Sequence, residues 1–159
     1  MIDVKNIDTI LKKSAIEAIN AISREKSGID FSIDENRYSL PSVNNENELA
    51  CVALEVETPV KLIFSLQSTL GLIVPITAAA MESNENEIGT EEYMDTAAEI
   101  LNVAAGACSK KILTQNLPLK LGIPRKNIVL NESSLCLLAK CRFIKNELDY
   151  IIFSVYAPE

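Results

Sequence analysis

Apolar residues recur at intervals of three and four near the start of the chain, which is the spacing of one helix face. They predict a helix over residues 4–26, which Gly28 would end. The residues that make this pattern are Ile7, Ile10, Leu11, Ala15, Ala18, Ile19 and Ile22.

Segments rich in Val, Ile, Leu and Phe come next and predict strands. Residues 49–57 and 60–67 form the clearest pair, and residues 57–59 fit a tight connection between them. Residues 30–40 have a weaker strand pattern, and the run of Asn and Glu over 44–48 is typical of a turn or loop.

The end of the chain predicts another antiparallel pair. Residues 134–144 and 147–157 would form a hairpin around residues 145–146, after a short extended piece over 126–130 that Pro124 opens. One buried and one exposed face would explain the alternation in its first strand, where Ala139, Cys141 and Phe143 alternate with Lys140 and Arg142.

Two helices are predicted between these strand pairs. Ser68 could cap the first, over residues 69–82. Pro75 lies within it, where a proline lacks a backbone donor and clashes with the preceding turn. We therefore expect this helix to be kinked or to begin near Pro75. The polar residues 83–90 predict a loop before the second helix.

The second, longer helix is predicted over residues 91–115. Thr90 fits its N-cap, and the acidic Glu91 and Glu92 suit the positive end of its dipole. Leu117 and Pro118 would end it.

Polar and small residues of the long helix fall on one face, because residues three and four apart share a side. This stripe contains Asp95, Glu99, Asn102, Gly106 and Ser109, and the opposite, core-forming side contains Ala97, Leu101, Ala104, Cys108 and Ile112. A carboxylate and a carboxamide thus project from a rigid element, beside a glycine that lets a partner's backbone come close. Such a pair can hold a water molecule and bind a cation, which points to hydrolysis on a docked partner.

The order helix, strands, two helices, strands is typical of an α+β domain with helices packed on an antiparallel sheet. The 159 residues have the size of one domain and no linker divides them, so we expect a single domain over 1–159. No apolar run reaches the roughly 18 residues that span a bilayer, and the N-terminus lacks the features of a secretory signal. We therefore expect a cytoplasmic protein without a membrane partner.

Charge and composition narrow the chemistry. The net charge is −7 and there is no basic block, so nucleic acid is a poor partner, whereas a partner with a basic patch or a lysine suits the chain. The absence of histidine excludes Ser-His-Asp and Cys-His catalysis. No C-x-x-C pair occurs, so we expect buried thiols and no metal site, with a redox or zinc role as the alternative. The four cysteines are Cys51, Cys108, Cys136 and Cys141.

The first helix repeats part of the polar stripe. Glu17 and Asn20 have the same E-x-x-N spacing as Glu99 and Asn102, but Lys13 stands at the position that matches Asp95. This spacing is common by chance, and it gains meaning only if a pseudo-twofold axis relates the two helices.

The pattern Asp95-x-x-x-Glu99-x-x-Asn102, followed by Gly106 and then by Pro124, resembles the signature of the CheC/CheX/FliY chemotaxis phosphatases. That signature is Asp or Ser, then E-x-x-N at the same spacing, then a later proline, and Pro124 lies within one position of it. The order of the predicted elements also resembles CheX. The resemblance implies a CheC/CheX-like α+β fold, in which long helices pack on one face of an antiparallel sheet, and Pro75 departs from the usual pattern, as do residues 30–48.

The resemblance also implies an activity, the dephosphorylation of a phosphoaspartate in a CheY-like response-regulator receiver. Asn102 would orient the attacking water with its carbonyl and amide groups, and Glu99 would pair with a lysine of the receiver. Asp95 and Gly106 would contribute to docking. The receiver would supply the magnesium ion, so no cofactor is expected in this chain.

Other functions stay open. The same helix could bind a receiver without turnover, or the domain could serve oligomerisation through its closing hairpin YIIFSVYA, because edge strands readily pair. The resemblance implies a homodimer, and it leaves open a CheD-like regulator. It also leaves open a second site at Glu17 and Asn20, which Lys13 disfavours.

Overall fold

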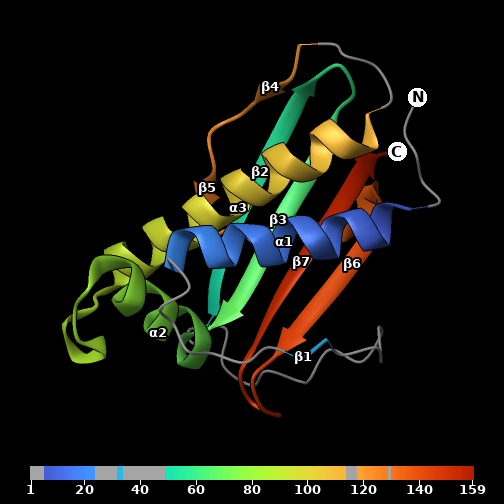
Figure 1. Cartoon of the computed structure of the whole chain (residues 1–159). Coiled ribbons are helices and arrows are strands. Elements are labelled where there is room, and N and C mark those ends of the chain that lie inside the picture. The colour runs from blue at the N-terminus through green and yellow to red at the C-terminus, as the bar shows by residue number, and fades with distance from the viewer. Residues whose placement is uncertain (1–5, 24–31, 34–48, 114–117, 129) are drawn as a thin grey trace.

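The computed structural model describes residues 6–23, 32–33, 49–113, 118–128 and 130–159. Its helices are α1 (Ile7–Ser23), α2 (Leu70–Met81) and α3 (Thr90–Ile112), with 3₁₀ turns η2 (Glu85–Glu87) and η3 (Glu132–Ser134). Its strands are β1 (Ser32–Ile33), β2 (Leu49–Thr58), β3 (Leu62–Thr69), β4 (Lys120–Leu121), β5 (Arg125–Lys126), β6 (Leu135–Ile144) and β7 (Tyr150–Pro158). The sheet order is β1-β6-β7-β3-β2-β4, all antiparallel, and β5 also pairs with β2 (Figure 1).

The predicted α+β arrangement is confirmed, with α1 and α3 lying across one face of the sheet (Figure 1). Alternate residues of the four long strands point to these helices and share one core with them. Burying such side chains contributes roughly 25 cal/mol for each Å² removed from water, so this layer is the main source of stability. The inward residues are Val52, Leu54, Val56, Leu62, Phe64, Leu66, Ala139, Cys141, Phe143, Ile151, Phe153 and Val155.

Small residues are buried where α1 and α3 contact each other and the sheet. Ala15 and Ala18 of α1 and Ala104 of α3 are fully buried, and such residues let helices approach closely. Ser109 is also fully buried, and its Oγ has no hydrogen-bond partner among the described residues. The prediction that Ser109 lies on an exposed polar stripe is therefore wrong, because neighbouring residues pack over this part of the helix.

Three helix ends differ from the prediction. Gly89, not Thr90, is the N-cap residue of α3, and Ile112 is its last residue, so the helix ends before Pro118. Ser68 lies inside β3, fully buried, and the N-cap of α2 is Thr69 instead. These shifts are small, and they leave the predicted helices in place.

The first turn of α2 is stabilised by a residue distant in sequence. The helix begins at Leu70 rather than near Pro75, which lies inside it. The carboxylate of Asp149, from the β6–β7 turn, lies so close to Gly71 that an added Cβ would collide with it. Thr69 Oγ1 donates a hydrogen bond of 3.3 Å to the same carboxylate. A negative charge at a helix N-terminus is favourable, so this contact helps the helix begin before the proline.

The closing hairpin is confirmed as β6 and β7, but β7 is not an edge strand. It pairs with β6 on one side and with β3 on the other. The prediction that its sequence YIIFSVYA extends the sheet across a dimer axis is therefore wrong. Only the Ser32–Ile33 part of the strand predicted over 30–40 lies within the described residues, and the loop predicted over 44–48 lies outside them.

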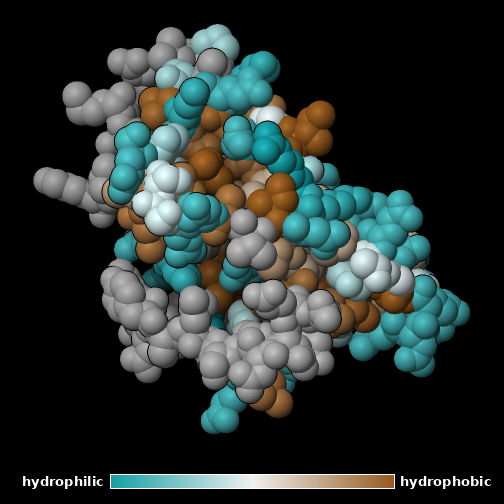
Figure 2. Space-filling model, turned by 180° about the vertical axis from the view of Figure 1, so that it is seen from behind, coloured by the Kyte–Doolittle hydropathy of each residue, from teal (hydrophilic) through white to brown (hydrophobic). Residues whose placement is uncertain are grey.

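The other face of the sheet is seen in Figure 2, where apolar side chains gather between hydrophilic ones. Tyr150, Ile152 and Tyr156 of β7 are buried on it. The Tyr156 hydroxyl donates a hydrogen bond of 2.6 Å to Glu132 Oε1 of η3. Burial, together with this bond, raises the pKa of Tyr156 to about 12. Within the described residues, no helix is long and apolar enough to cross a bilayer.

Candidate functional site

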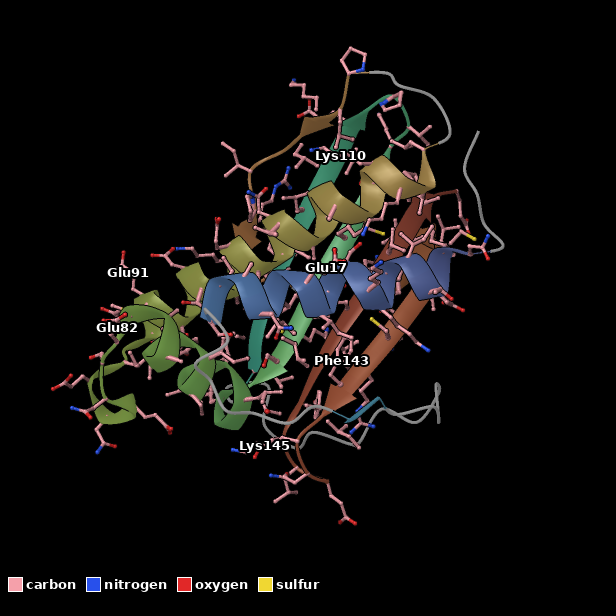
Figure 3. The ribbon with its side chains drawn as sticks, in the orientation of Figure 1. Glu17, Glu82, Glu91, Lys110, Phe143 and Lys145 are labelled. Carbon is pink, nitrogen blue, oxygen red and sulfur yellow. The ribbon has the colours of Figure 1, made fainter. Side chains whose placement is uncertain are left out.

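Helix α3 presents the predicted polar stripe on a rigid support. Its opposite side is anchored in the core, and every residue predicted for that side is buried: Ala97, Leu101, Ala104, Cys108 and Ile112. Asp95 and Glu99 are exposed, and Asn102 and Gly106 are half-buried. Figure 3 labels Glu91 and Lys110 near the two ends of this helix. Acidic residues in the first turn and basic residues in the last complement its dipole.

Glu99 and Asn102 are unengaged within the part of the chain that the structure describes. No described residue forms an ion pair or a hydrogen bond with either side chain. They are three positions apart, so they share a helix face. A carboxylate and a carboxamide are therefore available together for a ligand from outside.

Asp95 is engaged within the chain. Its carboxylate forms an ion pair with the Nζ of Lys126 in β5. Asp95 in the predicted stripe is thus bound to a neighbouring strand, whereas Glu99 and Asn102 are not. Sequence reasoning missed Lys126, whose only signal was its place two residues after Pro124.

Gly106 lies against β4. A Cβ placed on it would come 3.5 Å from Leu121 Cδ1, an ordinary van der Waals contact. Leu121 thus flanks the stripe one turn after Asn102, just as Lys126 flanks it one turn before Glu99. The β4–β5 segment, residues 120–126, therefore runs beside Glu99 and Asn102.

Backbone pairing holds this segment in place. Leu121 pairs with Val56 of β2 and Lys126 pairs with Val52. Between them, Gly122 N donates a hydrogen bond of 2.7 Å to Glu55 O. A Cβ on Gly122 would lie only 3.0 Å from that oxygen, so the close approach favours glycine.

The repeated E-x-x-N pattern in α1 has a different environment. Glu17 and Asn20 are exposed, as is Lys13. Glu17 Oε2 lies 3.2 Å from the Nζ of Lys111 in α3, where the two helices meet (Figure 3). Its carboxylate already has a cation from the chain itself, unlike that of Glu99.

None of the four cysteines forms a disulfide, and they differ in exposure. Burial raises the pKa of Cys108 and of Cys141 to about 12, so these thiols stay protonated. Cys51 is half-buried and Cys136 is exposed on β6, so the prediction of four buried thiols is wrong for Cys136. In the described ranges, no group of three or more His, Cys, Asp or Glu residues could hold a metal ion.

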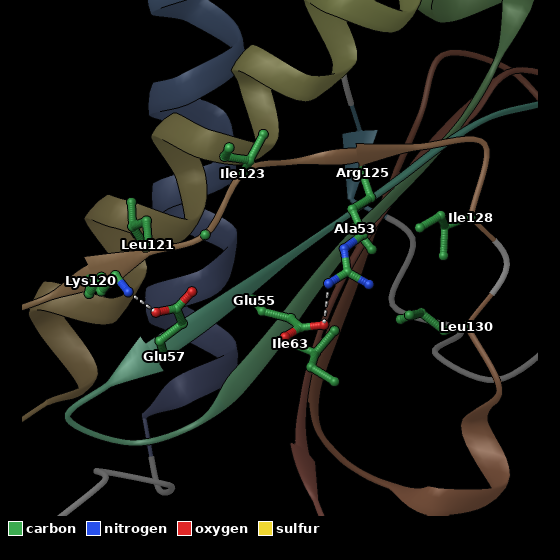
Figure 4. A pocket seen from close by; sticks show the side chains of 11 residues that line it. Ala53, Glu55, Glu57, Ile63, Lys120, Leu121, Ile123, Arg125, Ile128 and Leu130 are labelled. Carbon is green, nitrogen blue, oxygen red and sulfur yellow. Dashed lines mark ion pairs between the residues drawn. The ribbon is translucent and has the colours of Figure 1, made fainter.

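A cavity of about 520 Å³ lies between β2, β3 and the β4–β5 segment (Figure 4). The ion pairs Glu57–Lys120 and Glu55–Arg125 line it, the second at 3.5 Å. Its remaining walls are mostly aliphatic: Ala53, Ile63, Leu121, Ile123, Ile128 and Leu130. Neither Glu99 nor Asn102 lines it, but Leu121 and Ile123 line it and also lie beside α3, so the cavity and the α3 face adjoin along the β4–β5 segment.

The fold is that of solved chemotaxis proteins. A chemotactic CheC-like protein from Shewanella oneidensis matches with a TM-score of 0.65 and 13% identity, covering 95% of this chain and 97% of that one. The CheX–CheY–BeF3–Mg complex from Borrelia burgdorferi matches with a TM-score of 0.63 and 11% identity, over 93% and 97% of the two chains.

FliY from Thermotoga maritima matches with a TM-score of 0.57 and 16% identity, covering 96% of this chain and 86% of that one. No protein-family model and no curated protein sequence matches the chain. The structural likeness establishes the CheC/CheX-like fold that the α3 signature had predicted.

Proposed function

We propose that this protein is a member of the CheC/CheX/FliY phosphatases and hydrolyses the phosphoaspartate of a CheY-like receiver domain. One observation carries the proposal: Glu99 and Asn102 project together from a core-anchored helix, with neither side chain bound by a described residue, within a CheX-like fold. Neither the spacing nor the fold would suffice alone, because E-x-x-N also occurs in α1.

Asn102 orients the nucleophile in this proposal. Hydrolysis of an acyl phosphate needs a water in line with the leaving carboxylate. The Asn102 carbonyl accepts a hydrogen bond from that water and so aims its oxygen at phosphorus. The new P–O bond forms as the bond to the receiver's aspartate breaks, the aspartate leaves as a carboxylate, and the protons of the water leave with the inorganic phosphate. Positioning of this kind lowers barriers without a histidine base.

Glu99 sets the register of docking. Its free carboxylate pairs with a lysine next to the receiver's phosphoryl group, and this charge-assisted bond fixes how far α3 enters the receiver's site. The ion pair between Asp95 and Lys126 leaves Glu99 as the carboxylate nearest to Asn102 without a described partner. The receiver contributes the magnesium ion, which offsets phosphoryl charge.

The choice of partner is supported by the similarity to CheX in the Borrelia complex, whose name includes CheY, beryllofluoride and magnesium. The same family likeness supports a homodimer and a cytoplasmic location as part of the proposal. A CheD-like regulator is an additional candidate partner.

The test is the lifetime of receiver phosphate. Receivers encoded in the same genome are charged with acetyl phosphate, and phosphate release is followed with and without this protein. We expect release to accelerate with the wild type and to return to the intrinsic rate with Asn102→Ala. Unchanged lifetimes together with measurable binding would instead favour the alternative, a receiver-binding module without turnover.

A further inference from the structure

The β4–β5 segment carries an apolar side chain in an unusual position. Ile123 is 87% exposed, the largest exposed fraction among the large apolar residues that the structure describes. Single exposed apolar residues are common on protein surfaces. Ile123 differs from the others through its neighbours.

Two contacts fix the place of Ile123 relative to the candidate site. Lys126 binds Asp95, one turn before Glu99, and Leu121 lies against Gly106, one turn after Asn102. Ile123 lies between Leu121 and Lys126 in the chain, so it flanks the stretch of α3 that carries the two unengaged side chains. Figure 4 shows Ile123 and Leu121 on the strand segment that passes beside the helix.

Ile123 is also held rigidly. The hydrogen bond from Gly122 N to Glu55 O fixes the backbone before Ile123. Pro124, whose ring fixes its own φ, restricts the backbone after Ile123. A preorganised backbone loses little conformational entropy when a partner covers the segment. The segment therefore presents an apolar residue in a defined position, as an anchor residue at an interface does.

We propose that Ile123 is an apolar anchor for the phosphorylated receiver and helps to determine which receivers bind. This inference rests on the proposed function. The receiver would offer an apolar hollow for Ile123, beside the lysine that pairs with Glu99. The interface would then combine one apolar contact, one charge pair and the Asn102 amide.

Charge distinguishes this partner from a second copy of the chain. The exposed face of α3 carries Glu91 and Glu99, and the chain has a net charge of −7. A twofold axis passing near Glu99 would place this carboxylate against its own copy, which is unfavourable. A receiver that presents a lysine beside its phosphorylation site complements the same face.

The test uses Ile123→Ser, with Leu148→Ser as a matched control. Leu148 is 82% exposed but lies in the β6–β7 turn, which belongs to a different part of the sheet. Binding to beryllofluoride-activated receivers is measured alongside the rate of phosphate release. We expect Ile123→Ser to weaken binding and raise KM roughly 10-fold with kcat unchanged, as loss of a buried aliphatic contact would. Ile123→Leu should restore both values, and Leu148→Ser should match the wild type.

Several outcomes would overturn the inference. Ile123→Ser could bind receivers as tightly as the wild type, or Leu148→Ser could lose as much binding as Ile123→Ser. A fall in kcat without a change in KM for Ile123→Ser would also contradict it. If Ile123→Ser converts a dimer into a monomer in sedimentation, the residue serves self-association instead. If the wild type neither binds nor dephosphorylates any receiver, the proposed function itself fails. That result is distinguishable, because it appears before any variant is made.

Discussion

Helices α1 and α3 carry the same E-x-x-N spacing on adjacent elements, yet they present it differently. In α3, Glu99 has no partner within the described residues, whereas the Glu17 carboxylate of α1 lies 3.2 Å from Lys111.

The surroundings of the two helices differ as well. The β4–β5 segment flanks α3 and neutralises Asp95 through Lys126, whereas α1 has Lys13 at the matching position. A carboxylate that is paired with a cation of its own chain must give up that contact to serve an outside partner, which costs about 0–1 kcal/mol for an exposed pair. The comparison teaches that spacing alone does not make a site and that neighbouring elements decide which copy is available.

The largest expected effect separates the two asparagines. Asn102→Ala should lower the acceleration of receiver-phosphate release by a factor on the order of 100 or more, because the water is no longer aimed. Asn20→Ala, the matched change in α1, should leave the rate unchanged. Circular dichroism should show both variants folded, since neither side chain is fully buried. Equal loss in the two variants would mean that both helices are active.

The two glutamates give the next contrast. Glu99→Ala should raise the receiver concentration for half-maximal rate about 10-fold, as expected for a lost hydrogen bond between charged groups. Glu17→Ala should leave it unchanged, because that carboxylate already pairs with Lys111. Titration of each variant with a charged receiver measures this difference. A larger effect from Glu17→Ala would reverse the assignment of the two helices.

Gly106 tests whether the long helix serves docking or only packing. Ala at this position fits beside Leu121 and should raise the free energy of unfolding by about 1 kcal/mol, because alanine favours a helix interior over glycine. If a partner's backbone approaches here, the same variant should bind the receiver more weakly. Urea unfolding and receiver titration measure the two effects separately. A stabilised variant with unchanged binding would assign Gly106 to internal packing alone.

The smallest effect concerns the ion pair between Asp95 of α3 and Lys126 of β5. A double-mutant cycle on Asp95→Ala and Lys126→Ala should give a coupling free energy below about 1 kcal/mol, because both side chains are partly exposed and screened by water. The coupling should shrink further in high salt. A coupling of several kcal/mol would show that this pair holds the β4–β5 segment in place, rather than backbone pairing with β2.

Much of the architecture follows from local patterns. The period of α3 predicted its buried side through Ala97, Leu101 and Cys108, and all three are buried. Alternation in β6 likewise predicted that Ala139, Cys141 and Phe143 face the core. These predictions succeed because burial of an apolar stripe is the main contribution to the stability of the fold. The residues that form such a stripe lie close together in the chain.

The failed predictions share a different cause. Ser109 is polar but buried, since neighbouring residues pack over that part of the helix, and Ser68 does not cap α2 because it lies inside β3, paired with Ala50 of β2. β7 is an interior strand because β3 pairs with its free side. Each depends on a contact between residues far apart in the chain, which no local pattern contains.

By itself, then, the sequence determined the helices, the long strands and the grouping of Asp95, Glu99 and Asn102 on one helical face. Only the tertiary structure decided that Asp95 binds Lys126, that Glu17 binds Lys111 and that Glu99 stays unengaged among the described residues. Helical periodicity is set by backbone geometry over a few residues. Ion pairing depends on which distant cation the fold brings within reach of each carboxylate.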